Sequence, residues 1–547
     1  MTQQHPGYDS LPDIADVLVV GAGPSGAAIA KAFADARMSV VCLEQGDWPD
    51  YSTARSDQPE FEVAAGKAWS PLPNVRRGVG DYPIDETEAD ISALMWNGVG
   101  GSVMLYAGQW MRNMPSDFRV RSLDGVADDW PFTYEDLVPF YAQAERDFAV
   151  AGLHGDPAVP ASSTYPMLAA PIGEAGRRVA AGHNRLGWHW WPGSNAIATR
   201  TYGNLKPCVQ RGTCIWGCID GAKSTPDITH WPDLVASGVH LVARAAVARV
   251  ETDARGRATG VVFVDAAGVE RRQRARLVVL AANGVGTPRI LLMSATAQHP
   301  NGLANSSGLV GKRLMMHPYA AVVGTFDDPI GTTQGAYGQL IYSLQFYETD
   351  VSRGFVRGAK WNLMPTGGPI AMMRPFPWGD SSGLWGEGFH DTVRARLNHS
   401  VTWGITCEDL PEERNQVVLS DTQVDDYGLP AAKIVYETSE NSRRMLEFQA
   451  ARAQESLLAA GASSVSVAPQ VRETGWHLLG TTMMGEDPAT SVVNGYGIAH
   501  DMPNLVIADG STWPTSAGMN PTATVAAMAL RTADHLIAHR SVQEVSA

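Results

Sequence analysis

The sequence contains few cysteines, fewer basic than acidic residues, and no long apolar run. Its 5 Cys in 547 residues predict no disulfide framework. Apolar runs such as residues 278–282 fall far short of the about 20 residues that a membrane-spanning helix needs, so we expect no membrane insertion. The formal net charge is −15 and no basic run occurs, which argues against a nucleic-acid partner.

Residues 1–16 are polar and carry neither a basic segment nor a twin-arginine pair, so they lack the pattern of a secretory signal. We therefore expect a cytoplasmic protein, and export together with a signal-bearing partner is the alternative. The chain is too long for one ordinary hydrophobic core, which predicts two or more domains. The 55 Gly suit a protein whose backbone lies close to a large cofactor.

A dinucleotide-binding unit is predicted near the N-terminus. Residues 17–20 (VLVV) are typical of a strand that is buried on both faces. The motif GAGPSG follows, then a helix of small residues at 27–34, a strand at 39–43 and an acidic residue. This order is the fingerprint of a dinucleotide site, although it does not distinguish FAD from NAD. The predicted contacts are Gly21, Gly23, Pro24, Ser25, Gly26 and Glu44.

Three further segments carry motifs that point to chemistry. Residues 95–106 (MWNGVGGSVMLY) form a glycine-rich loop, and residues 475–480 (GWHLLG) contain His477. Residues 509–522 (DGSTWPTSAGMNPT) place Asn520 before a proline that suits the first turn of a helix. Histidine can take a proton from an alcohol because its ordinary pKa of about 6.5 is near working pH. Asn520 cannot act as a base, but its amide can donate to the substrate oxygen and position the carbon.

These motifs, together with residues 278–284, 287–294 and 311–318, resemble the glucose-methanol-choline (GMC) oxidoreductase family over nearly the whole chain. The resemblance is greatest to bacterial pyranose and glycoside oxidases and to FAD-dependent glucose or gluconate dehydrogenase subunits. Within residues 287–294, Thr287 is the expected helix cap and Pro288 the expected first turn. His317 matches the family's entry into the substrate domain, and we interpret it as structural.

The resemblance implies an α/β fold with two discontinuous domains. The Rossmann-like FAD-binding domain would comprise residues 11–150, 225–318 and 471–547. The substrate domain, a mixed or antiparallel sheet flanked by helices, would comprise residues 151–224 and 319–470.

The resemblance also implies roles for single residues. His477 corresponds to the family's base and Asn520 to its substrate-positioning partner. The helix after Asn520 would direct its N-terminus at the flavin, where its partial positive charge stabilises the reduced anion. Leu105 occupies the position at which some sugar oxidases carry a histidine bonded to FAD, so we expect non-covalent FAD. The further implied FAD contacts are Gly100, Gly101, Ser102, Val247, Asp509, Gly510, Asn520, Pro521 and Thr522.

Three cysteines leave two interpretations open. Cys208, Cys214 and Cys218 have the spacing C-x5-C-x3-C, which in glucose dehydrogenase subunits is associated with an iron–sulfur cluster. Ile219 follows in place of the proline that often succeeds a cluster cysteine. We favour a packed loop without metal and keep the cluster as the alternative.

The predicted function is oxidation of a secondary alcohol on a pyranose sugar or glycoside. His477 takes the hydroxyl proton, a hydride passes to flavin N5, and oxygen or another acceptor reoxidises the flavin. Gln339, Thr402 and Trp403 are the candidate substrate contacts. One alternative is a quinone- or cytochrome-linked sugar dehydrogenase subunit that carries the iron–sulfur cluster. Another is a hydroxynitrile-lyase-type enzyme that keeps FAD without redox turnover.

Overall fold

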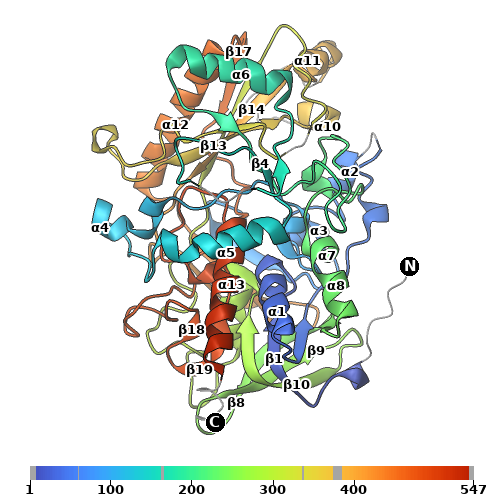
Figure 1. The fold of residues 1–547 in the computed structure, drawn as a ribbon, viewed down its shortest axis with the longest axis vertical. Coiled ribbons are helices and arrows are strands. Elements are labelled where there is room, and N and C mark those ends of the chain that lie inside the picture. Colours follow the sequence, from blue (N-terminus) through green and yellow to red (C-terminus); the bar gives the residue numbers. More distant parts are fainter. Residues whose placement is uncertain (1–7, 59–60, 162–164, 336–337, 374–384, 541–547) are drawn as a thin grey trace.

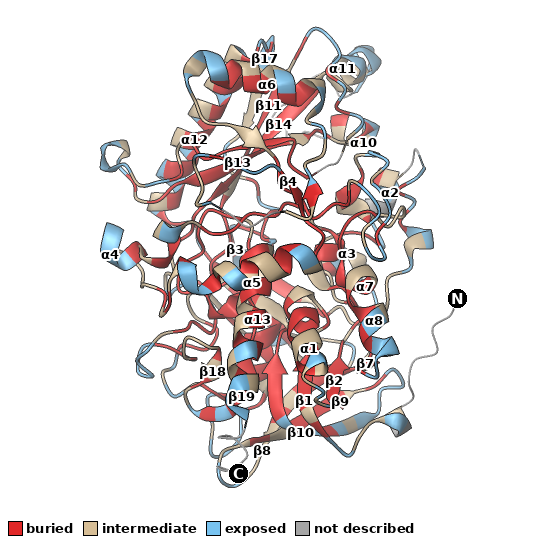
Figure 2. Cartoon of the chain, in the orientation of Figure 1, coloured by how far each residue is buried: buried red, intermediate tan, exposed pale blue. Residues whose placement is uncertain are grey.

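The computed structural model describes residues 8–58, 61–161, 165–335, 338–373 and 385–540. Figure 1 shows two bodies stacked along the long axis, each built around a β-sheet. Each body has a hydrophobic core of its own. Figure 2 shows that buried residues are concentrated in the sheets and on the helix faces that pack against them. The predicted α/β fold class is confirmed.

The first sheet has a parallel centre. β1 (Ile14–Val20) lies between β10 (Glu270–Leu280) and β2 (Val40–Leu43) and runs parallel to both. β19 (Met502–Ile507) continues the sheet beside β10, and β7 (His240–Val242) continues it beside β2. The apolar runs of β1 and β2 are buried, as expected for parallel strands that are covered on both faces.

Three helices cover one face of this sheet (Figure 1). α1 (Pro24–Asp35) and α5 (Tyr134–Asp147) both pack against α13 (Thr522–Ala538). Alanines dominate the buried surfaces of α1 and α13, so the two helix axes can approach closely. Helices from the two ends of the chain therefore lie side by side, and their N-termini belong to one region of the molecule.

The N-terminal part of β10 is antiparallel to its neighbour. Residues 270–274 pair antiparallel with β9 (Ala258–Val264), which pairs in turn with β8 (Ala246–Thr252). β18 (Ile498–Ala499) pairs antiparallel with β19 at the other edge.

The second sheet is antiparallel throughout and has the order β17-β11-β14-β13-β12-β6. α12 (Glu440–Ala459) and α6 (Gly173–Leu186) pack together and cover one face of it. The strands are β17 (Ser464–Ala468), β11 (Tyr319–Thr325), β14 (Ser400–Cys407), β13 (Ala359–Pro365), β12 (Ile341–Ser343) and β6 (Trp191–Pro192).

The two faces of this sheet differ in chemistry. Trp361 of β13 and Trp403 of β14 belong to the core beneath the helices. Side chains alternate along a strand, so Lys360, Asn362 and Thr402 lie on the opposite face. This polar face is turned toward the first body, because Lys360 contacts Asn520 there.

A third, three-stranded sheet lies beside α9 (Asn283–Met293). The hairpin of β15 (Gln416–Val424) and β16 (Pro430–Tyr436) pairs with β3 (Ile84–Ala89) and packs on this helix. The hairpin falls within the residues expected in the substrate domain, yet it shares a core with elements of the FAD-binding domain. The domain limits given above stay a proposal. The hairpin is the part of the proposed substrate domain that packs with the FAD-binding domain.

The predicted start of α9 is wrong by five residues. The helix begins at Asn283, and Pro288 lies inside it. Asn283 Oδ1 accepts from the backbone N–H groups of Val285 and Gly286 at 2.9 and 3.2 Å. Thr287 lies inside the helix, where its hydroxyl accepts from the N–H of Ala282 at 3.1 Å and donates to Asp509 at 2.6 Å.

The remaining short elements lie mainly in the connections. They are α2 (Phe61–Ala65), α3 (Pro73–Arg76), α4 (Val120–Asp124), β4 (Ala151–Gly152), β5 (Met167–Leu168), α7 (Pro226–Thr229), α8 (Trp231–Ala236), α10 (Pro369–Met372) and α11 (Phe389–Arg396).

Across the part of the chain that the structure describes, no helix is both long and apolar enough to cross a membrane.

Candidate active site

A cavity opens at the carboxyl ends of the parallel strands. This is where ligands bind in sheets of this kind. The structure does not place Gly26, Gly100 and Asn520 among its lining residues, but the other predicted cofactor contacts and the predicted base lie around it. They are Gly21, Gly23, Pro24, Ser25, Glu44, Gly101, Ser102, Val247, His477, Asp509, Gly510, Pro521 and Thr522.

The two glycine loops meet at this cavity. A Cβ on Gly101 would lie 2.6 Å from Gly23 Cα, and Gly101 has a φ of +63°. A Cβ on Gly26 would lie 2.0 Å from the Gly21 carbonyl oxygen, which is where α1 approaches the end of β1. Any larger residue would displace backbone at these points, so the loops form a cradle in which main chain can approach a ligand closely.

The cradle offers polar groups both for the ribose and for the phosphates of a dinucleotide. Glu44 lines the cavity and is buried, with its oxygens accepting from the N–H groups of Ala22 at 2.8 Å and Gly46 at 3.0 Å. Each carboxylate oxygen can accept a further hydrogen bond, as ribose hydroxyls would supply. The first turns of α1 and α13 also border the cavity, and helix N-termini favour anionic groups such as a pyrophosphate.

Asp509 holds one wall of the cavity together. Its carboxylate accepts from Thr287 Oγ1 at 2.6 Å, Asn283 N at 3.0 Å, Ser511 N at 2.9 Å and Ser511 Oγ at 2.5 Å. The group is buried, and burial raises the pKa of its carboxyl. The side chain is fully engaged within the protein, so a contact with FAD would fall to the backbone of Asp509 and Gly510.

His477 and His317 form a directly bonded pair. Their Nδ1 atoms are 2.6 Å apart, and His317 Nε2 lies 2.5 Å from the Ala517 carbonyl oxygen. A carbonyl only accepts, so His317 Nε2 carries the proton. Burial lowers the pKa of His317 to about 4, so its ring is neutral and its Nδ1 has a free lone pair.

The proton positions on His477 follow from this arrangement. Its Nδ1–H must donate to His317 Nδ1, which leaves His477 Nε2 without a proton. Burial, and then the proximity of His317 and Lys360, lower the pKa of His477 well below its ordinary value. The ring lines the cavity and keeps part of its surface exposed. His477 therefore offers an unprotonated nitrogen as a proton acceptor.

His317 makes a contact that the structural role expected for it does not include. Its ring lies against His477, in a place to fix the proton positions of the candidate base. The available signal was a histidine two residues before β11, a strand of the second body. Sequence alone does not show that this point lies beside a loop 160 residues further along the chain.

Asn520 has a partner that its own motif does not predict. Lys360 Nζ donates to Asn520 Oδ1 at 2.6 Å. Lys360 is buried, and burial lowers the pKa of its ammonium well below the ordinary value. Asn520 keeps part of its surface exposed. The available signal was polar Lys360 and Asn362 alternating with Trp361 and Leu363 within one strand.

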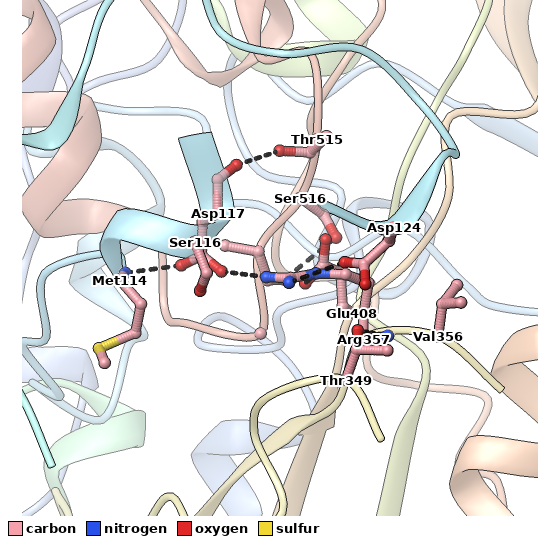
Figure 3. A network of polar contacts seen from close by, with 12 residues as sticks. Met114, Ser116, Asp117, Asp124, Thr349, Val356, Arg357, Glu408, Thr515 and Ser516 are labelled. Atoms are coloured by element: carbon pink, nitrogen blue, oxygen red, sulfur yellow. Dashed lines mark hydrogen bonds and ion pairs between the residues drawn. The ribbon is translucent and has the colours of Figure 1, made fainter. Parts of the chain in front are cut away.

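A buried ionic network braces the loop that carries Asn520 (Figure 3). Arg357 donates to Asp117 at 2.6 Å, to Glu408 at 2.9 Å and to Asp124 at 3.2 Å. Asp117 accepts from the Tyr347 hydroxyl at 2.8 Å, and that hydroxyl accepts from the N–H of Gly518 at 3.0 Å. Hydrogen bonds therefore connect the loop, through Tyr347, to Asp117 of the first body and to the Arg357 network of the second.

Asp409 braces the other side of the same loop. Its Oδ2 accepts from Met316 N at 3.0 Å, next to His317, and its backbone N–H donates to Ser516 Oγ at 2.8 Å. Burial raises the pKa of Asp409 to about 7. Both the histidine pair and the Asn520 loop are therefore held by contacts with residues remote in sequence.

The GMC oxidoreductase model matches residues 15–319 with its N-terminal part and residues 411–529 with its C-terminal part.

The chain belongs to the GMC oxidoreductase family.

Two relatives and one solved structure illustrate the similarity. The chain is 37% identical to 2-methyl-1,2-propanediol dehydrogenase of Mycolicibacterium austroafricanum over 96% of its own length and 95% of the relative's. It is 30% identical to 6'''-hydroxyparomomycin C oxidase of Streptomyces lividus over 96% and 92% of the two lengths. A variant of formate oxidase from Aspergillus oryzae RIB40 has the same fold, with a TM-score of 0.63, 15% identity, and coverage of 97% of this chain and 99% of that one.

This GMC oxidoreductase is an FAD-dependent enzyme that acts on CH–OH groups. The glycine cradle, the free acceptor positions on Glu44 and the two helix N-termini fit that cofactor. The predicted family, cofactor and enzyme class are confirmed. The roles of the individual residues remain proposals.

The candidate substrate contacts occupy different environments. Trp403 is fully buried in the core of the second sheet, where its Nε1 donates to Ser456 at 3.0 Å. That position does not favour contact with a substrate. Thr402 lies on the polar face, turned toward the first body. Gln339 is buried and donates to the Ser194 carbonyl at 2.8 Å, while its Oε1 has no partner among the described residues.

The cysteine loop gives no support to the iron–sulfur alternative. Cys208 and Cys218 are half-buried, Cys214 is buried, and none of the three is joined in a disulfide within the described structure. Within the described ranges, no three or more His, Cys, Asp or Glu side chains are arranged to hold a metal ion. Lys223 ties the loop to the fold by donating to the carbonyls of Met104 and Cys214 at 2.8 and 2.6 Å. The geometry agrees with a packed loop.

Proposed function

We propose that this GMC oxidoreductase oxidises a secondary alcohol of a pyranose sugar or glycoside, with His477 as the base. The observation that carries the proposal is the unprotonated Nε2 of His477 at a cavity that fits FAD. A hydroxyl that reaches this nitrogen can give up its proton there. The positive charge that forms on the ring is shared through His317 with the Ala517 carbonyl, so the pair can accept the proton without a buried carboxylate partner.

Asn520 has the complementary role. Its Oδ1 is bonded to Lys360, so its amide N–H groups are free to donate to the substrate oxygen. Such a contact holds the reacting carbon in line and stabilises negative charge that develops on the oxygen. FAD, when bound, supplies the acceptor for the two electrons that leave the carbon. The N-terminus of α13 provides a positive potential at the same place.

The substrate class rests on two observations. The Streptomyces lividus relative is named as an oxidase of a paromomycin, an aminoglycoside. The polar face of the second sheet, which carries Lys360, Asn362 and Thr402, is turned toward the first body through the Lys360–Asn520 contact, and its donors and acceptors would suit a substrate with several hydroxyl groups. The Mycolicibacterium austroafricanum relative is named for a small diol, so oxidation of a small vicinal diol is the second candidate.

Anaerobic reduction of the bound flavin tests the function. Pyranoses, aryl glycosides, aminoglycosides and 1,2-propanediols are mixed with the holoenzyme, and bleaching of the flavin absorbance is followed. Rapid bleaching by a pyranose or glycoside supports the proposal, and bleaching by diols alone favours the second candidate. Absence of bleaching together with release of cyanide from a cyanohydrin would identify a lyase. Admission of air, and then of a quinone, identifies the electron acceptor.

The His477→Ala variant tests the base. We expect flavin reduction to slow by about 10² to 10⁴-fold, the usual contribution of general base catalysis. FAD content should stay stoichiometric, because the ring contributes only one part of the cavity wall. Reduction at the wild-type rate by His477→Ala would remove this residue from the mechanism.

A further inference from the structure

Two buried lysines of this protein have different surroundings. Lys223 Nζ donates to three backbone carbonyls, those of Met104, Tyr106 and Cys214, at 2.8, 3.1 and 2.6 Å. Three fixed acceptors match the three donors of an ammonium group, which is the pattern of a lysine that stabilises the fold. Lys360 is fully buried as well, but the hydrogen bond that Nζ makes within the described part of the chain is to Asn520 Oδ1, at 2.6 Å.

The position of Lys360 is fixed by the sheet. β13 lies between β12 and β14, and Lys360 is paired with Thr406 of β14. The next residue, Trp361, is buried in the opposite core and donates to Gln449 Oε1 at 2.7 Å. The backbone that carries Lys360 therefore has little freedom, and its amine reaches Asn520 from a rigid strand.

The contact decides which way the amide of Asn520 faces. An asparagine amide can present either its oxygen or its N–H groups, and the two orientations have almost the same shape. The amine of Lys360 donates to Oδ1, so Nδ2 is directed away from the lysine. Without that donor, the amide could turn its oxygen toward the substrate oxygen, where the two would repel each other.

We propose that Lys360 is a positioning residue that orients the Asn520 amide so that its N–H groups face the substrate oxygen. The inference rests on the function proposed above. It assigns to the second body a direct part in building the oxidation site, because the strand that carries Lys360 belongs to the second sheet and Asn520 precedes a helix of the first body. Burial lowers the pKa of the amine, and the 2.6 Å contact has Nζ as the donor and Oδ1 as the acceptor.

A double-mutant cycle tests the proposal. Lys360→Met removes the donor, and Lys360→Gln has the same length as Met but can still donate. We expect Lys360→Met to slow anaerobic flavin reduction by about 10 to 10²-fold with little change in substrate affinity, as for misplacement of a reacting group. Lys360→Gln should stay within about 5-fold of the wild type. In the Asn520→Ala background, Lys360→Met should cost less than about 2-fold, because the lysine acts through the asparagine.

Several outcomes separate this role from a merely structural one. Equal losses for Lys360→Met in both backgrounds, or equal rates for the Met and Gln variants, would overturn the proposal. If Lys360→Met does not load FAD, Lys360→Ala is assayed with ethylamine and, as control, ethanol. We expect ethylamine alone to restore the rate by at least about 5-fold, and no restoration would count against the proposal. His477→Ala is measured in parallel, since a normal rate there would refute the proposed base and not the Lys360–Asn520 coupling.

Discussion

The two histidines of the active site differ in what each can do. His317 is buried, and both of its nitrogens are engaged, one by His477 and the other by the Ala517 carbonyl. His477 has one engaged nitrogen and part of its surface exposed at the cavity. Only His477 can therefore meet a substrate, and His317 acts by fixing the proton positions of its neighbour.

This division of roles predicts the effect of replacing His317. In His317→Ala the acceptor for His477 Nδ1–H is lost and the ring can adopt the wrong tautomer. We expect flavin reduction to slow by about 10²-fold. In His317→Asn the side-chain oxygen can take the place of Nδ1, so that variant should retain more activity. Stopped-flow reduction of the two holoenzymes measures both rates of flavin reduction, and a wild-type rate for His317→Ala would contradict this role of His317.

Leu105 predicts that FAD is bound without a covalent bond to the protein. The residue is buried with Trp69 and Met104, and a leucine side chain has no nucleophile that could bond to FAD. Acid precipitation of the holoenzyme should therefore leave all the flavin in the supernatant. Flavin absorbance in the washed pellet would show a covalent bond and refute the expectation.

At the scale of elements, the cofactor cradle depends on two loops that meet. The turn between β1 and α1 and the loop that contains Gly101 are remote in sequence, yet Gly101 and Gly23 are in backbone contact. A Cβ at Gly101 would displace the Gly23 backbone, whereas a Cβ at Gly23 would lie 3.7 Å from Gly101 Cα, an ordinary contact. The cradle is therefore a property of the pair of loops, and damage to one loop affects both.

Gly101→Ala should lower the FAD content of the purified protein to well below one per chain. The new Cβ would lie 2.6 Å from Gly23 Cα at a φ of +63°, which strains the backbone as well as the contact. Gly125→Ala is the matched control, because Gly125 has a φ of +74° but no atom within 4 Å of the new Cβ. The ratio of flavin to protein absorbance measures both variants, and equal FAD content would refute the role of the loop contact.

At the scale of the whole molecule, buried acids tie the two bodies together. Asp117 and Glu408 are both bonded to Arg357, and burial raises the pKa of each carboxyl despite the nearby guanidinium. Glu408 Oε1 has no hydrogen-bond partner within the described structure. The network therefore holds ionisable groups that bind protons more tightly in the folded protein than in the unfolded chain.

The raised pKa values make stability depend on pH. Stability that comes from such a carboxyl is present below its unfolded pKa and is lost as pH rises through its folded pKa. Buried histidines act in the opposite direction, but only below about pH 6.5. Between about pH 6.5 and pH 9 the buried carboxyl of Glu408 therefore lowers the Tm as the pH rises, whereas the buried amine of Lys360, whose pKa is lowered, has the opposite effect. Glu408→Gln, which keeps the acceptor for Arg357, removes the carboxyl contribution, so its Tm should fall less, or rise more, over this range than that of the wild type. Thermal unfolding at both pH values compares the two proteins, and identical slopes would exclude Glu408 as a source.

Features that depend on residues close in sequence could be predicted, whereas features that depend on residues far apart in sequence could not. The β1–α1 turn, the strand that ends at Leu43 and the helix after Pro521 follow from local patterns, and all three lie where predicted. The start of α9 was misplaced because the helix begins earlier, at Asn283, whose Oδ1 accepts from the N–H groups of Val285 and Gly286. Thr287 lies inside the helix, and its hydroxyl donates to Asp509, more than 220 residues away, a contact that no local pattern shows.

The sequence by itself determined the cofactor class and the candidate base. The motifs that specify them are short, and their chemistry depends on residues that are close in sequence. The tertiary structure decided which groups control that base and its partner. His317 meets His477, and Lys360 meets Asn520, each across 160 residues. No local pattern encodes such contacts, because only the packing of two separate sheets brings these side chains within hydrogen-bonding distance.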